Sequence, residues 1–250
     1  MITDLILADE RYAGFAGRVL GAYVGGILAE AIGPRAEVTL RRPVPTGSRL
    51  QRRVLPDLTA TLSIGDTIVA EGRPGDLDIE LPDAVSFEEA EQASARYPGH
   101  AKHLFPRCFV CGPARQPGDA LRIFPGAVPG RPLVAAPWVP DVGFADNEGG
   151  VLPRIVWSAC DCPALWALIL AAPRHSLDLV VTGSIITNIL GRLEAGQPHV
   201  VCAWPLGGQR RLLWAGAAVF TATGELRAVA RQTCVRTDWG VPLGLAAWQA

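Results

Sequence analysis

The same order of expected elements occurs twice along the chain, and this repeat constrains the fold more than any single motif does. Apolar and small residues recur at helical spacing over 17–32 and again over 153–171, and strand-like segments follow each pattern. In the first part these segments are 36–45, 48–57, 58–65 and 67–74. In the second part they are 178–190, 197–206, 209–224 and 225–237, and a further strand-like segment, 133–140, precedes the helix. A helix followed by an antiparallel meander, present twice, predicts an α+β fold of two packed units.

Turns and composition indicate where the two units begin and end. Gly65 and Gly224 each begin a turn dipeptide between the last two strand-like segments of a unit. Between the units the chain is rich in proline, glycine and charged residues. We predict an N-terminal unit over 1–78, a linker with some local order over 79–130 and a C-terminal unit over 131–250.

The composition excludes several classes of protein. The chain has 250 residues, of which 49% are hydrophobic and 19% charged, so it can bury a sizeable core. A formal net charge of -1 gives no bulk attraction to nucleic acid or to an anionic membrane. No apolar run approaches the ~20 residues of a membrane span, and the N-terminus lacks the basic region of a secretory signal. We therefore expect no nucleic-acid partner, no membrane span, a cytoplasmic location and free cysteines.

One carboxylate lies within the apolar stretch WSACDCPALW of the second helical pattern. A buried carboxylate either finds hydrogen-bond partners or changes its pKa, because burial without partners is costly. Asp161 could be the N-cap of a helix that starts at Cys162, since Pro163 suits the first turn of a helix. Alternatively the helix runs through, and Asp161 is a working acid.

Several short stretches of the chain together carry a family resemblance. The first helical pattern contains LGAYV, and VTLRRPVPTGSRL follows it. In the second part SACDCPALWAL contains Asp161, Ser184 lies 23 positions later, and Gln232 lies eight residues after Gly224. In this order the stretches resemble motifs of the double hot-dog acyl-CoA thioesterases of the type II family. LGAYV resembles a degraded copy of that family's Phe-Gly-Gly-Gln-Val-like motif, and serine stands where the family more often has threonine.

The resemblance implies a tandem hot-dog fold and thioester hydrolysis with Asp161, Ser184 and Gln232 around the attacking water. It also implies an acyl-CoA or acyl-carrier thioester as partner, no cofactor, a role in fatty acid metabolism and a homo-oligomer. Gly21, Tyr23 and Trp157 are the substrate-binding residues that it suggests.

The chemistry of these residue types is consistent with that role. An aspartate in apolar surroundings has a raised pKa and is a stronger base, while glutamine both donates to and accepts from a water. Each residue also has an ordinary structural interpretation: Gln232 as a polar residue on an exposed strand face, and Ser184 as a hydroxyl that bonds its own backbone.

The cysteines raise two further possibilities. Cys108 and Cys111 form a Cys-x-x-Cys pair near His100 and His103, but a structural zinc site needs four ligands, and we expect no metal here. A nucleophilic Cys160 or Cys162 would need a histidine base, and the sequence offers His175 and His199.

Two other functions remain open at this point. One is a hot-dog hydratase, a class whose motif resembles Asp-x-Asn-Pro-x-His. This chain has Asp146 and Asn147, but the proline and histidine of that motif do not follow them. The degraded first-helix motif leaves a non-catalytic acyl-binding protein as the other alternative. Coenzyme A phosphates could be bound by arginines, with Arg192, Arg210 and Arg211 as candidates.

Overall fold

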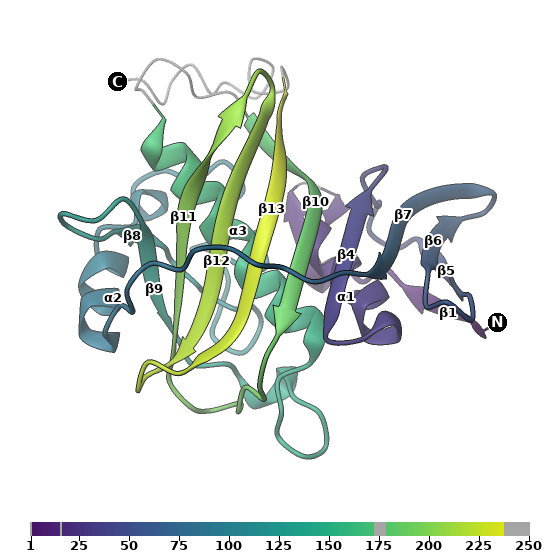
Figure 1. Ribbon diagram of the computed structural model, residues 1–250, viewed down its shortest axis with the longest axis horizontal. Coiled ribbons are helices and arrows are strands. Elements are labelled where there is room, and N and C mark those ends of the chain that lie inside the picture. The colour runs from purple at the N-terminus through teal and green to yellow at the C-terminus, as the bar shows by residue number, and fades with distance from the viewer. Residues whose placement is uncertain (1, 16, 173–178, 238–250) are drawn as a thin grey trace.

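The computed structural model describes residues 2–15, 17–172 and 179–237. Most strands of this part of the chain form one continuous antiparallel sheet that curves around two helices (Figure 1). In spatial order its strands are β1 (Ile2–Leu7), β5 (Arg49–Val54), β6 (Ala60–Ile64), β7 (Thr67–Pro74), β4 (Arg35–Leu40), β10 (Leu179–Ile189), β13 (Leu226–Thr237), β12 (Leu212–Thr221), β11 (His199–Gln209), β9 (Val134–Trp138) and β8 (Gly126–Ala127). A separate small hairpin joins β2 (Ala13–Phe15) to β3 (Arg18–Val19).

The two halves join at the centre of this sheet. Strand β4 of the first half pairs antiparallel with β10 of the second half, with Val38 opposite Ile185. The predicted hairpins are present, and Gly65 and Gly224 adopt positive φ angles of 55° and 87° that favour glycine in their turns. The predicted order of helix and antiparallel strands along the chain is therefore confirmed in both halves. The predicted meander is wrong in one respect, because the first strand after each helix pairs with the last strand, β4 with β7 and β10 with β13, and not with the next.

One helix of each half lies on the concave side of the sheet. Helix α1 (Gly21–Ile32) contacts β4 and β7, whereas α3 (Pro153–Ala171) contacts β11 and β12. Helix α1 begins at Gly21 rather than at residue 17, because 18–19 form β3 and Gly17 has a positive φ of 68° that interrupts the helical pattern.

Helices α1 and α3 approach each other closely. A side chain at Gly26 would place its Cβ 2.4 Å from the Cα of Arg154, and one at Gly25 would lie 3.0 Å from the ring of Trp157. These glycines, which weaken a helix by themselves, are required by the contact between the helices.

Helix α3 is itself 19 residues long and, by length and composition, apolar enough to cross a membrane. The expectation that no apolar run reaches this length is therefore wrong. Burial explains the composition, because 72% of its apolar window lies inside the protein, between α1 and the sheet.

The segment after β7 crosses the outer face of the sheet (Figure 1). Leu77 packs there against Ile186 and Val229, and the side-chain amide of Asn188 donates to the carbonyl oxygen of Leu77 at 3.0 Å. The predicted linker 79–130 also contains α2 (Phe87–Ser94), whose N-terminus has a capping box. Strand β8 near its end extends the main sheet, so the linker has more regular structure than its composition indicates.

The contact between the helices gives a first prediction. Gly26→Ala improves intrinsic helix propensity by about 1 kcal/mol, but its Cβ would overlap the α3 backbone. We expect a net loss of about 1–3 kcal/mol in the free energy of unfolding, measured by urea denaturation. A variant as stable as the native protein would mean that the helices do not touch at this glycine.

Candidate active site

Asp161 lies in the interior of α3 and is 2% exposed. The helix starts at Pro153 and continues through Pro163 to Ala171. Asp161 is therefore not the N-cap of a helix beginning at Cys162, and the structure excludes that interpretation.

The carboxylate of Asp161 has hydrogen-bond donors from two other elements. The Thr182 hydroxyl on β10 donates to Oδ1 at 2.8 Å, and the Ala22 backbone N–H, in the first turn of α1, approaches Oδ2 at 3.4 Å. Burial raises the pKa of Asp161 to about 6, although the bonds from Thr182 and Ala22 partly oppose this shift. The positive end of the α1 dipole favours the charged carboxylate at this place.

Gln232 on β13 completes this polar cluster. Its side chain is fully buried, and its Nε2 donates to the carbonyl oxygen of Cys160 at 2.9 Å. Its Oε1 lies 3.4 Å from the Thr182 hydroxyl. The structure thus brings Asp161 and Gln232 together through Thr182, as the family resemblance implies.

Ser184 does not occupy the place that the sequence spacing predicts. Gln232 and Cys234 are two residues apart on β13, so both lie on the face of the strand toward the helices. The β10 residues that pair with them, Ile185 and Thr182, lie on the same face. A β-bulge between Thr182 and Ser184 supplies the extra residue, and Ser184 pairs instead with Thr233 on the alternate face. The hydroxyl beside Asp161 is therefore that of Thr182, and a glycine inside the strand, Gly183, was the signal for the bulge.

A cavity of about 430 Å³ lies beside the carboxylate. Asp161 and Thr182 are among its few polar lining residues, and most of its wall is apolar, with Leu20, Leu40, Phe105, Leu165, Ile169 and Val180 among the side chains. Arg41 and Arg42 also line the cavity and are exposed, so they mark where it meets solvent. This shape suits a ligand with an apolar chain and a charged end.

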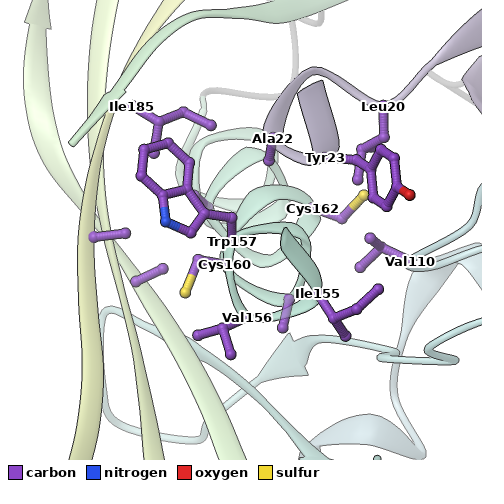
Figure 2. Close-up of a cluster of buried hydrophobic side chains, with 14 of the residues drawn as sticks. Leu20, Ala22, Tyr23, Val110, Ile155, Val156, Trp157, Cys160, Cys162 and Ile185 are labelled. Carbon is purple, nitrogen blue, oxygen red and sulfur yellow. The ribbon is translucent and has the colours of Figure 1, made fainter. Parts of the chain in front are cut away.

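The predicted substrate-binding residues separate into two groups. Gly21 lines the cavity, whereas Tyr23 and Trp157 are not among the lining residues. Tyr23 stacks on Tyr12 with ring centroids 3.9 Å apart, and Trp157 is 1% exposed. Figure 2 shows Trp157 between α3 and Ile185, within the apolar core.

The arginines predicted for phosphate binding lie elsewhere. Arg192 pairs with Glu148 and Glu194, and the Arg211 guanidinium donates to a backbone oxygen of β13. Neither these residues nor Arg210 line the cavity. The arginines on its wall are Arg41 and Arg42, and the sequence analysis assigned neither to phosphate binding.

Nucleophilic cysteine chemistry finds little support in the geometry. Burial raises the pKa of Cys160 to about 12, which keeps this thiol protonated. His199 lies 2.8 Å from the backbone oxygen of Gln197 and beside Trp138, and His175 lies outside the described residues.

A second group of thiols lines the same cavity. Cys108 and Cys111 from the linker meet Cys162 of α3, and their sulfur atoms all lie within 4.8 Å of one another. The Nε2 of His103 is 3.3 Å from Cys111 Sγ, while its Nδ1 accepts the backbone N–H of Phe105 at 2.9 Å. In the neutral ring Nε2 therefore carries the proton and donates to the sulfur, so His103 cannot deprotonate Cys111 in this geometry.

Comparison with solved structures identifies the fold. The tesB protein of Mycobacterium avium subsp. paratuberculosis overlays with a TM-score of 0.62 and 16% identity, over 94% of this chain and 92% of that one. A protein assigned as a thioesterase II from Thermobifida fusca overlays with a TM-score of 0.58, 16% identity and the same two coverages. The chain has the α+β double hot-dog fold of such thioesterase-like proteins. No protein-family model matches the chain, and no curated protein matches its sequence.

The bond between Thr182 and Asp161 gives a second prediction. Thr182→Val removes the hydroxyl but keeps the shape, so one buried carboxylate oxygen loses its donor. We expect a loss of about 1–3 kcal/mol in the free energy of unfolding at neutral pH. The matched control is Ser184→Ala, for which we expect a change within about 0.5 kcal/mol. Equal losses in the two variants would contradict the hydrogen bond.

Proposed function

We propose that this protein hydrolyses an acyl thioester, with the Asp161 carboxylate as general base for the attacking water. The observation that carries the proposal is the position of this carboxylate: it is buried, held by Thr182, and lines a mostly apolar cavity. Such a cavity can hold an acyl chain, and a carboxylate on its wall can take a proton from water.

The proposed reaction proceeds by direct attack of water. Asp161 accepts a proton as the water oxygen forms a bond to the acyl carbonyl carbon. The carbon–sulfur bond then breaks, the thiolate leaves, and the proton held by Asp161 returns to the leaving sulfur. The products are a carboxylic acid and a thiol. The Ala22 N–H in the first turn of α1 lies 3.4 Å from Asp161 Oδ2, so the positive end of this helix would face the negative charge that develops during the attack.

Thr182 and Gln232 are positioning residues in this proposal. The Thr182 hydroxyl orients one oxygen of Asp161, and Gln232 holds the α3 backbone through the carbonyl oxygen of Cys160. This arrangement replaces Ser184 in the set that the sequence suggested.

The structural comparisons support a thioesterase-like protein through names and fold only, because the identities are 16%. A non-catalytic acyl-binding protein is the main alternative, and turnover of a panel of acyl-CoA thioesters, followed by release of free thiol, separates the two. The homo-oligomer, the cytoplasmic location and the role in fatty acid metabolism stay predictions.

The proposed base is tested by Asp161→Asn, a third prediction. Asparagine keeps an oxygen that can accept from Thr182, but it cannot take a proton. We expect kcat/KM for the best acyl-CoA to fall by about 10²–10⁴-fold, while the melting temperature stays equal or rises because a buried charge has gone. Thr182→Val and Gln232→Ala should lose less, and Ser184→Ala should retain native activity. Native turnover in Asp161→Asn would end the catalytic interpretation of this residue.

The carrier of the acyl group is tested at Arg42, a fourth prediction. Arg41 is already paired with Glu71 at 2.7 Å, whereas Arg42 is exposed at the solvent end of the cavity and suits a phosphate. An exposed charge contact is worth ~1 kcal/mol, so Arg42→Ala should raise KM for an acyl-CoA by about fivefold. KM for the matching acyl-pantetheine, which lacks the phosphates, should not change. Arg210→Ala is the control, and an equal effect on both substrates would exclude phosphate recognition by Arg42.

A further inference from the structure

Three thiols from two segments that are distant in sequence meet on the wall of the cavity. Cys108 and Cys162 are 54 residues apart in sequence, yet their sulfur atoms lie 3.6 Å apart. With Cys111, all three sulfur atoms lie within 4.8 Å of one another. Figure 2 shows Cys162 on the side of α3 that faces Val110, with Cys160 on a different side of the helix.

The linker backbone is folded tightly around its two cysteines. The N–H of Gly112 donates to the carbonyl oxygen of Cys108 at 3.0 Å, which closes a turn over the Cys-x-x-Cys pair. A Cβ at Gly112 would lie 2.5 Å from the Cys108 nitrogen and 2.6 Å from its oxygen, so only glycine fits. The turn directs both sulfur atoms toward Cys162.

The partners of Cys111 hold it in place. The Tyr97 hydroxyl donates to the backbone oxygen of Cys111 at 3.0 Å, and the His103 N–H lies 3.3 Å from its sulfur. An N–H group placed against a sulfur atom is a common outer-shell partner of a metal ligand. Since His103 uses its Nδ1 to accept the Phe105 N–H, it supports the group without being a ligand.

The spacing of the sulfur atoms fits a thiophilic cation. Zinc–sulfur bonds of about 2.3 Å in tetrahedral geometry place sulfur atoms about 3.8 Å apart. The sulfur atoms of Cys108 and Cys162 are already 3.6 Å apart. The sulfur atom of Cys111 lies within 4.8 Å of each of them, so it needs to approach by at most about 1 Å.

We propose that Cys108, Cys111 and Cys162 bind a thiophilic divalent cation, of which Zn²⁺ is the probe. All three residues line the cavity, so a water or ligand can fill the fourth position from that side. Binding releases protons from the thiols and ties the linker to α3. This site does not depend on the proposed hydrolysis. It reverses the expectation that the linker cysteines bind no metal, because that expectation did not count Cys162 as a third ligand.

The proposal is tested on the full chain purified without added metal and without chelator. We expect about one zinc per chain by elemental analysis. After reduction and removal of the metal, Co²⁺ should bind with the charge-transfer absorption of cobalt thiolates. Cys108→Ala and Cys111→Ser should lose both signals. The matched control is Cys202→Ala, because Cys202 is equally buried but belongs to a separate apolar cluster, and it should keep both.

Three results would overturn the proposal. The first is native protein that contains no zinc and gives no cobalt absorption after reduction, a result that needs no variant to fold. The second is equal metal content in the Cys108→Ala and Cys202→Ala variants, with circular dichroism confirming that both are folded. The third is a disulfide between two of the three cysteines in freshly purified protein, detected by mass spectrometry after alkylation. None of these readouts involves activity, so failure here leaves the hydrolysis proposal separately testable.

Discussion

A carboxylate inside an apolar helix needs donors, and the donors of Asp161 come from both halves of the protein. The N–H of Ala22 belongs to the first helix, and the hydroxyl of Thr182 belongs to a strand of the second half. The Thr182 hydroxyl reaches the carboxylate because β10 packs on α3 within the second half, and the Ala22 N–H reaches it because α1 lies in contact with α3. The second half therefore supplies the three polar side chains, and the packing of the two halves adds the Ala22 N–H as a further donor.

Much of the fold could be predicted because its signals are local. The helical spacing, the alternation of the strands and the glycine turns at Gly65 and Gly224 each lie within one element or one hairpin. The beginning of the first helix was misplaced because Gly17 and its neighbours are compatible with helical spacing, although the chain forms a short hairpin there. Tertiary pairing determined that boundary, and no local pattern reports it.

The site was predictable only where position along one element was sufficient. Asp161 is unusual in its own stretch, and Gln232 was placed by its family-like distance from the glycine turn of its hairpin. Thr182 was missed because a bulge of one residue exchanges the two faces of β10, and counting residues cannot detect this exchange. Tyr23 and Trp157 lie on the correct helices, but their rings turn into the core, a choice that depends on which helix packs opposite.

The thiol cluster shows the same limit over a longer range. Cys162 follows Asp161 directly, and consecutive residues of a helix point about 100° apart. The side of this turn of α3 that carries Asp161 therefore meets α1 and β10, and the side that carries Cys162 meets the linker. The cavity borders both sides. The apolar wall comes from many elements of the sheet, the first helix and the linker, but a single helical turn presents both the carboxylate and a thiol to it. Because this turn is buried and the first helix crosses it closely, its two polar positions are fixed by the same packing that holds the halves together.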